Sequence, residues 1–133
     1  MDEEQSRWVD PVASGMASAA ALPEDELVLA VALFRLLGDP TRGRLLYALQ
    51  AAGELCVGDL AGVVGAQEST VSHALRLLRA AGVVKARRAG RLMFYRLADE
   101  HVTELLQLTH QHVDHTVVEV PARGIPSGGR AAG

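Results

Sequence analysis

The stretch from Gln67 to Ala81, QESTVSHALRLLRAA, combines an apolar stripe with a polar face. Val71, Leu75 and Leu78 recur at spacings of four and three, which predicts a helix with one buried side. An ordinary surface helix has the same spacing, so the neighbouring segments decide. The polar face offers donors and acceptors of the size that base edges and phosphates use. The candidate DNA contacts in this stretch are Gln67, Glu68, Ser69, Thr70, Ser72, His73 and Arg76.

The segments before this helix predict further helices separated by Gly and Pro. One helix opens at Pro23 with acidic residues in its first turn and stops at Gly38. Asp39-Pro40 starts a second helix, which runs to a break at Gly53. Residues 54–57 form a short apolar crossing, residues 59–64 a brief helix, and Gly65-Ala66 a turn. This order predicts a helix–turn–helix whose second helix, residues 67–81, enters a DNA groove.

After Gly82 the apolar period changes from that of a helix to that of a strand. Residues 83–88 and 92–97 are predicted strands, and residues 89–91, with Gly in the middle, are the turn of a hairpin. A basic hairpin directly after a recognition helix is typical of a wing that contacts the DNA backbone or minor groove. The alternative is a charged hairpin that only faces solvent. The candidate wing contacts are Arg87, Arg88 and Arg91.

Charge is distributed unevenly along the 133 residues. The net charge of −3 argues by itself against a nucleic-acid partner. Residues 69–98, however, contain seven Lys and Arg residues and no Asp or Glu. Local charge matters more than the sum when the partner is a polyanion, so the pattern favours double-stranded DNA.

Residues 1–22 are predicted to be a flexible arm with room for a short helical piece, residues 23–118 the folded domain, and residues 119–133 a flexible tail. A last helix is expected from about 100 to 118, capped by Asp99. The single cysteine, Cys56, excludes an internal disulfide framework. No secretory signal or membrane span is recognisable, so a cytoplasmic location is expected.

Five strings resemble the ArsR/SmtB family of winged-helix metal-sensing repressors. This resemblance implies a mainly α fold with a small β-hairpin. It also implies a homodimer formed through the first and last helices, and repression of an operator that an inducer relieves. The strings are LLGDPTRGRLLYAL (36–49), ELCVGDLAGVVG (54–65), ESTVSHALRLLRAAGVV (68–84), RRAGRLMFYRL (87–97) and DEHVTELLQLTHQHVDH (99–115).

One branch of that family binds soft metals through two cysteines in a CVCDL string. Here the string reads Cys56-Val57-Gly58-Asp59-Leu60, so the second thiol is missing. A three-thiolate site cannot be built from one cysteine. Cys56 is therefore interpreted as a small buried apolar residue.

A second branch places its site on the last helix, with the spacing Asp-x-His followed by His-x2-His. This chain has Asp99 and His101, then His112 and His115. At about 100° per residue the three imidazoles share one face, and His110 lies roughly 180° from His101. One helix places His101 and His112 roughly 16 Å apart, so one copy cannot surround an ion that needs ligands at about 2 Å. Two antiparallel copies of the helix can surround such an ion, with Asp99 and His101 from one copy and His112 and His115 from the other.

Three nitrogens and one carboxylate oxygen form a closed tetrahedral set, which favours Zn(II), with Co(II) or Ni(II) as possible alternatives. The favoured function is a metal-responsive repressor released from its operator by metal. The resemblance also implies that the His112 imidazole links the metal to a backbone carbonyl near Ala81 or Gly82. Alternatives are a repressor with a non-metal or redox inducer acting on Cys56, and a small metalloenzyme. The closed ligand set and the lack of a separate acid–base pair argue against an enzyme.

Overall fold

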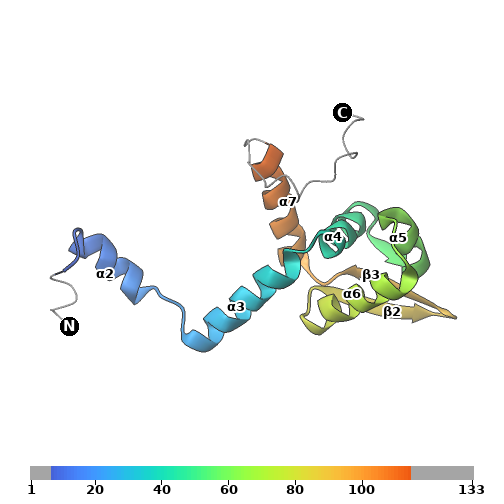
Figure 1. Cartoon of the computed structure of the whole chain (residues 1–133), viewed down its shortest axis with the longest axis horizontal. Coiled ribbons are helices and arrows are strands. Elements are labelled where there is room, and N and C mark those ends of the chain that lie inside the picture. The colour runs from blue at the N-terminus through green and yellow to red at the C-terminus, as the bar shows by residue number, and fades with distance from the viewer. Residues whose placement is uncertain (1–6, 115–133) are drawn as a thin grey trace. The chain divides into compact units, whose positions relative to one another are not determined.

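The chain divides after Asp39 into two units, residues 1–39 and residues 40–133. The computed structural model describes residues 7–114. Figure 1 labels the helices and strands of both units.

The first unit consists of two helices, α2 (Pro11–Ala19) and α3 (Glu24–Leu37). Asp10 caps α2, because its side chain accepts a hydrogen bond of 3.0 Å from the backbone N–H of Ala13. Residues 1–22 therefore contain a helix of nine residues where the sequence predicts at most a short helical piece. α3 agrees with its prediction and ends at Gly38. Neither helix buries a residue within the described part of the chain.

The second unit contains the helix–turn–helix and the wing. Its elements follow the predicted order except for a strand at residues 54–56, and α5 begins two residues earlier than expected. The predicted end of the last helix, at about residue 118, lies outside the described residues. The elements are α4 (Pro40–Ala52), β1 (Glu54–Cys56), α5 (Val57–Val64), α6 (Glu68–Ala80), β2 (Val84–Ala89), β3 (Leu92–Leu97) and α7 (Glu100–Asp114).

The turn between α5 and α6 depends on Gly65. Its φ of 71° lies in the left-handed region, which glycine adopts without the steric cost that a Cβ brings. In this conformation the Gly65 N–H donates to the carbonyl oxygen of Ala61 at 2.9 Å and closes α5. The chain then turns into α6, with Gln67 as the residue before its first turn.

The strands form one antiparallel sheet in the order β1-β3-β2. Val84 pairs with Leu97 and Ala89 with Leu92, so the predicted hairpin is confirmed. The expected crossing at residues 54–57 requires a correction, because Glu54–Cys56 is a third strand paired with β3. Three residues are too few to display a period of two, and the partner strand lies some forty residues later in the sequence, so no local pattern reveals this pairing.

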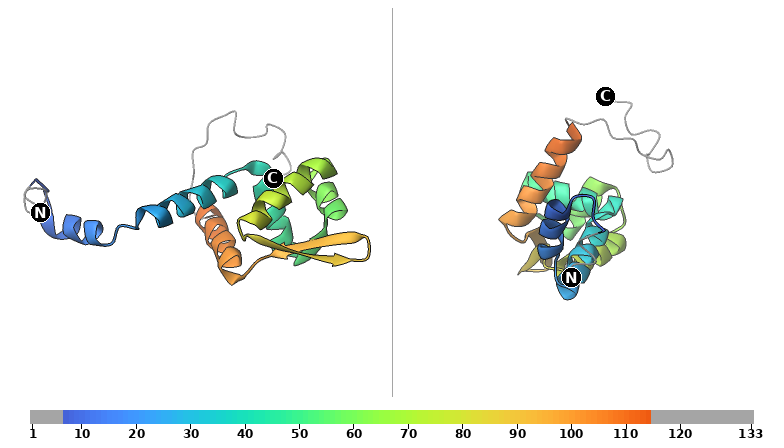
Figure 2. Two further views of the ribbon diagram at one scale, coloured as in Figure 1. Left: turned by 90° about the horizontal axis from the view of Figure 1, so that it is seen from below. Right: turned by 90° about the vertical axis from the view of Figure 1, so that its left-hand side faces the viewer.

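The core lies between the helices and the sheet. Figure 2 shows α4, α5 and α6 on one side of the strands. Val71, Leu75 and Leu78 are fully buried, which confirms the predicted stripe of α6. Burial of each such side chain contributes about 1.5–3 kcal/mol, so this stripe holds the recognition helix in place. The other largest buried side chains are Leu45, Leu46, Leu49, Leu60 and Val84.

Candidate DNA interface and metal site

The polar face of α6 is open to solvent. Packing of Val71, Leu75 and Leu78 into the core turns the opposite side of the helix outward. Among the candidate DNA contacts, only Ser72 is half-buried. The exposed ones are Gln67, Glu68, Ser69, Thr70, His73 and Arg76.

Glu68 is turned toward the start of α5. Its Oε2 lies 3.5 Å from the position that a Cβ on Gly58 would occupy. The carboxylate therefore lies at the junction of the two helices of the helix–turn–helix, while the hydroxyl and imidazole groups of Ser69, Thr70 and His73 lie along the exposed face. None of these side chains carries a negative charge, so they are better suited than Glu68 to approach an anionic backbone.

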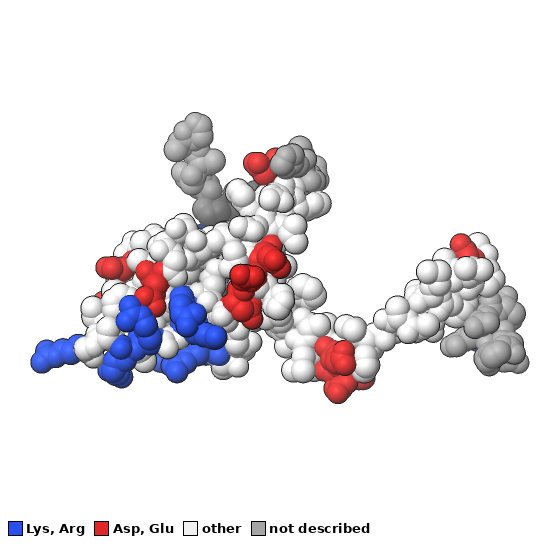
Figure 3. Space-filling view, turned by 180° about the vertical axis from the view of Figure 1, so that it is seen from behind, with Lys and Arg blue, Asp and Glu red and all other residues white. Residues whose placement is uncertain are grey.

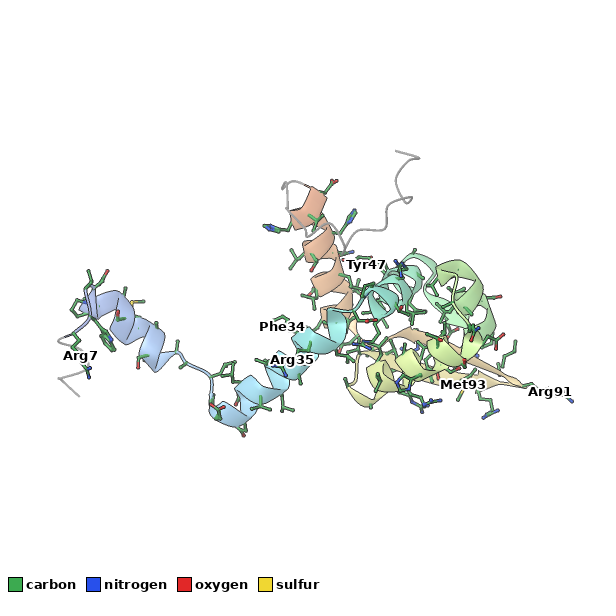
Figure 4. All side chains as sticks on the ribbon, in the orientation of Figure 1. Arg7, Phe34, Arg35, Tyr47, Arg91 and Met93 are labelled. Atoms are coloured by element: carbon green, nitrogen blue, oxygen red, sulfur yellow. The ribbon has the colours of Figure 1, made fainter. Side chains whose placement is uncertain are left out.

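Basic side chains gather around α6 and the hairpin. Figure 3 shows them as blue patches on one face of the molecule. Arg91 lies at the tip of the hairpin, as Figure 4 shows, and Arg88 is also exposed. Neither arginine has an ion-pair partner among residues 7–114. Both guanidinium groups are therefore available to an external anion.

The base of the wing is an open pocket with three cations in its lining. Arg79 comes from α6, Lys85 from β2 and Arg96 from β3. Lys85 and Arg96 are directly paired across the two strands. Like charges in this position are destabilising, so the sheet carries a charge density that an anionic partner would relieve.

Arg87 differs from the other wing arginines. Its Nη2 and Nε donate to Oε1 and Oε2 of Glu54 at 2.7 and 2.8 Å, a bidentate ion pair from β2 to β1. The guanidinium also lies over the ring of Phe94, with Cζ 4.8 Å from the ring centroid. The hydrogen bond from Arg87 lowers the pKa of Glu54 below its ordinary value, and the same bond raises the pKa of Arg87.

The start of α7 holds two of the candidate metal ligands. Asp99 Oδ1 accepts a hydrogen bond of 3.2 Å from the backbone N–H of Val102 and so caps the helix, as predicted. The same oxygen lies 3.8 Å from His101 Nδ1. The side chains of His101 and Asp99 are 92% and 56% exposed, so both can reach a ligand outside their own chain.

The other candidate ligands lie at the far end of α7. His112 is exposed, and His115 lies outside the described residues. At about 100° per residue His110 lies on a different side of the helix from His112. The ring of His110 is 6.5 Å from the ring of Tyr47 on α4. Within the described part of one chain, no three His, Cys, Asp or Glu side chains are close enough to hold a metal. The fold of one copy therefore does not bring the two ends of α7 together.

Residues 39–86 match the family described as "Bacterial regulatory protein, arsR family". A protein named "Transcriptional repressor SmtB homolog", from Synechocystis sp., is 42% identical over 113 residues, which cover 85% of this chain and 79% of that protein. This chain belongs to the arsR family. It is therefore a helix–turn–helix transcriptional regulator of the ArsR/SmtB kind and not an enzyme.

Two further proteins are similar to this chain over a shorter stretch or in fold. A "Cadmium resistance transcriptional regulatory protein CadC homolog" from Staphylococcus aureus is 42% identical over 80 residues, 60% of this chain and 66% of that protein. The solved homodimeric winged helix-turn-helix DNA-binding domain Mb0332 from Mycobacterium bovis, a possible ArsR-family regulator, superposes with a TM-score of 0.63. It is 27% identical and covers 76% of this chain and 99% of that chain. The winged-helix prediction is confirmed.

Cys56 is buried, as expected of an apolar core residue. Glu54 was not among the predicted functional residues, because its contact with Arg87 depends on the pairing of β1 with β3.

No helix in the described part of the chain is long and apolar enough to cross a membrane.

Proposed function

We propose that this arsR-family chain is a metal-responsive repressor that binds operator DNA as a homodimer and leaves it when Zn(II) binds between the subunits. The observation that carries the proposal is the exposed pair Asp99 and His101 at one end of α7, with exposed His112 near the other end. A pair of ligands at each end of one helix suits an antiparallel partner helix better than a single chain.

The dimer is supported by apolar side chains that one copy leaves in water. Phe34 of α3 is 67% exposed and Leu108 of α7 is 63% exposed. Clusters of such residues mark protein–protein contacts in soluble proteins. A second copy would cover them, in agreement with the homodimeric relative from Mycobacterium bovis. The exposed apolar residues of the two helices are Leu27, Val28, Leu29, Val31, Leu33, Phe34, Leu105, Leu108 and Val113.

DNA binding is proposed to use α6 in the major groove and the hairpin at the backbone or minor groove. The exposed side chains of Ser69, Thr70 and His73, with Ser72 beside them, would contact base edges or phosphates. Gln67, Glu68 and Arg76 complete the helix surface, and Arg88 and Arg91 would contact phosphates. Arg87 belongs to the same basic surface, but its guanidinium is already paired.

The proposed metal site combines Asp99 and His101 of one subunit with His112 and His115 of the other. Symmetry gives two equivalent sites. Three imidazoles and one carboxylate suit Zn(II), with Co(II) or Ni(II) as alternatives. A cadmium-resistance regulator is among the relatives, so Cd(II) belongs in the same test. When bound, the metal would tie the two α7 helices together and favour one dimer geometry.

The residues of α7 can couple this geometry to the DNA-binding surface through α4. Tyr47 Oη donates to the carbonyl oxygen of Leu106 at 3.0 Å, and Gln50 Nε2 donates to that of Thr103 at 3.4 Å. A change in the angle between the two α7 helices would therefore move α4, and with it α6, which packs in the same unit. The ligand shifts the equilibrium only by its difference in affinity for the two geometries.

A second candidate is an arsR-family repressor with a redox or other non-metal inducer. The single thiol, Cys56, is buried, which limits access of an oxidant and favours the metal reading. The discriminating experiment uses metal-stripped protein and an operator recovered by selection from random duplexes. We expect Zn(II) to lower operator affinity in wild type and Cys56→Ala, but not in His101→Ala. If Zn(II) failed to lower operator affinity in Cys56→Ala but still lowered it in His101→Ala, the result would favour an inducer that acts on the Cys56 thiol.

A further inference from the structure

Glu54 is the only acidic residue in the three strands, and it lies among basic ones. It pairs across β1 and β3 with Arg96, which in turn pairs with Lys85 on β2. Its carboxylate nevertheless contacts neither neighbour in this row within ion-pair distance. It reaches diagonally across β3 to Arg87, with contacts of 2.7 and 2.8 Å. The Glu54 carboxylate therefore forms its ion pair with Arg87 and not with Arg96 or Lys85.

The ion pair occupies one of the two bidentate edges of the Arg87 guanidinium and neutralises its charge. A guanidinium binds a carboxylate or a phosphate through two parallel N–H groups, and Arg87 already commits Nε and Nη2 to Glu54. The same guanidinium lies over the ring of Phe94, with Cζ 4.8 Å from the ring centroid, and this contact adds to its attachment to the sheet. Arg88 and Arg91, by contrast, have no ion-pair partner within residues 7–114.

We propose that Glu54 is a positioning residue that withholds Arg87 from DNA and leaves the phosphate contacts of the wing to Arg88 and Arg91. This inference rests on the proposed DNA-binding function. Phosphate contacts strengthen binding to every sequence alike. An acid that neutralises one wing cation therefore lowers non-specific affinity, and it anchors β2 to β1 so that the hairpin keeps its direction.

The test is the salt dependence of binding to a mixed-sequence DNA duplex, measured with the full metal-free chain. Each phosphate contact that is lost lowers the magnitude of the slope of log K against log salt by about 0.9. We expect Arg87→Gln to leave the slope unchanged and the matched control Arg91→Gln to lower it by about 0.9. Glu54→Gln should release Arg87 for a further phosphate contact. The magnitude of the slope should then increase by about 0.9, and binding at low salt should become tighter.

Exchange of the two charges separates this role from a purely structural one. The double variant Glu54→Arg with Arg87→Glu rebuilds the ion pair, and its slope should match the wild type. A direct phosphate contact by Arg87 would instead be replaced by a repulsive Glu, and the slope would fall. If the wild type binds DNA and Arg87→Gln lowers the magnitude of the salt slope as much as Arg91→Gln does, this inference is wrong and the proposed function still stands. Absence of DNA binding by the wild type overturns the proposed function and this inference together.

Discussion

Tyr47 Oη donates a hydrogen bond of 3.0 Å to the carbonyl oxygen of Leu106 and so joins α4 of the helix–turn–helix body to α7. Among the described residues of α7, Leu106 is the only buried one, so this hydrogen bond is made where the helix packs against the rest of the unit. The ring of the same tyrosine also faces His110. The helix that carries the candidate metal ligands is therefore attached through α4 to the helix–turn–helix that contains α6.

Removal of this attachment tests its importance. Tyr47→Phe deletes the donor but keeps the ring, so we expect the free energy of unfolding to fall by about 1 kcal/mol. If α4 transmits the metal signal, the factor by which Zn(II) weakens operator binding should also fall. Denaturant unfolding and operator titrations measure the two effects. Tyr95→Phe is the matched control, since no hydrogen bond of its hydroxyl is present within the described residues.

The recognition helix and the wing should differ in what they contribute to affinity. Replacing Ser72 and His73 by Ala should weaken binding to the operator more than to random duplexes, because base contacts carry sequence information. Replacing Arg88 and Arg91 by Gln should weaken both by similar factors. Fluorescence anisotropy on both DNAs gives the ratio. Equal losses for the two pairs would contradict this division of roles.

The metal-free protein should already be a dimer. The exposed apolar residues of α3 and α7 would otherwise remain in water, so sedimentation at micromolar concentration should show two copies. Leu108→Glu places a charge on the α7 surface and should give monomers. Leu92→Glu, at a position of the wing that is 52% exposed, should leave the dimer intact. A monomeric wild type would remove the basis of an intersubunit site.

The two histidines near the end of α7 should have opposite phenotypes. His112→Ala removes a proposed ligand, so repression without metal should persist and release by metal should be lost. His110→Ala should remain inducible, because its ring faces Tyr47. Operator affinity with and without saturating metal decides the point, and linkage requires DNA to reduce metal affinity by the same factor. Loss of induction in His110→Ala with retention in His112→Ala would exclude the proposed face.

The ion pair of Glu54 predicts a dependence of stability on pH. The pKa of this carboxyl is lowered from 4.5, chiefly by the hydrogen bond from Arg87. A lowered pKa in the folded state adds stability that is present above the unfolded value and lost as the pH falls through the folded value. The difference in unfolding free energy between wild type and Glu54→Gln should therefore shrink as the pH falls below 4.5. Glu104→Gln, on the exposed surface of α7, provides the control series.

Local patterns in the sequence were sufficient for the helix–turn–helix. The spacing of Val71, Leu75 and Leu78 defines the buried side of α6, and the same spacing determines which polar residues face outward. Glycines at the turns and the change of period after Gly82 marked the other boundaries. These features depend on residues a few positions apart, so a single sequence displays them.

Contacts between distant segments were decided only by the tertiary structure. Glu54 meets Arg87 because β1 pairs with β3 and β3 with β2, which brings together residues that lie thirty-three positions apart. No periodicity of Glu54–Cys56 indicates this pairing, since three residues are too short to show one. In the same way, the helical angle separates His110 from His101, but only the packing of α7 against α4 gives His110 its neighbour, Tyr47. Periodicity determines which face a residue occupies, whereas long-range packing determines what that face meets.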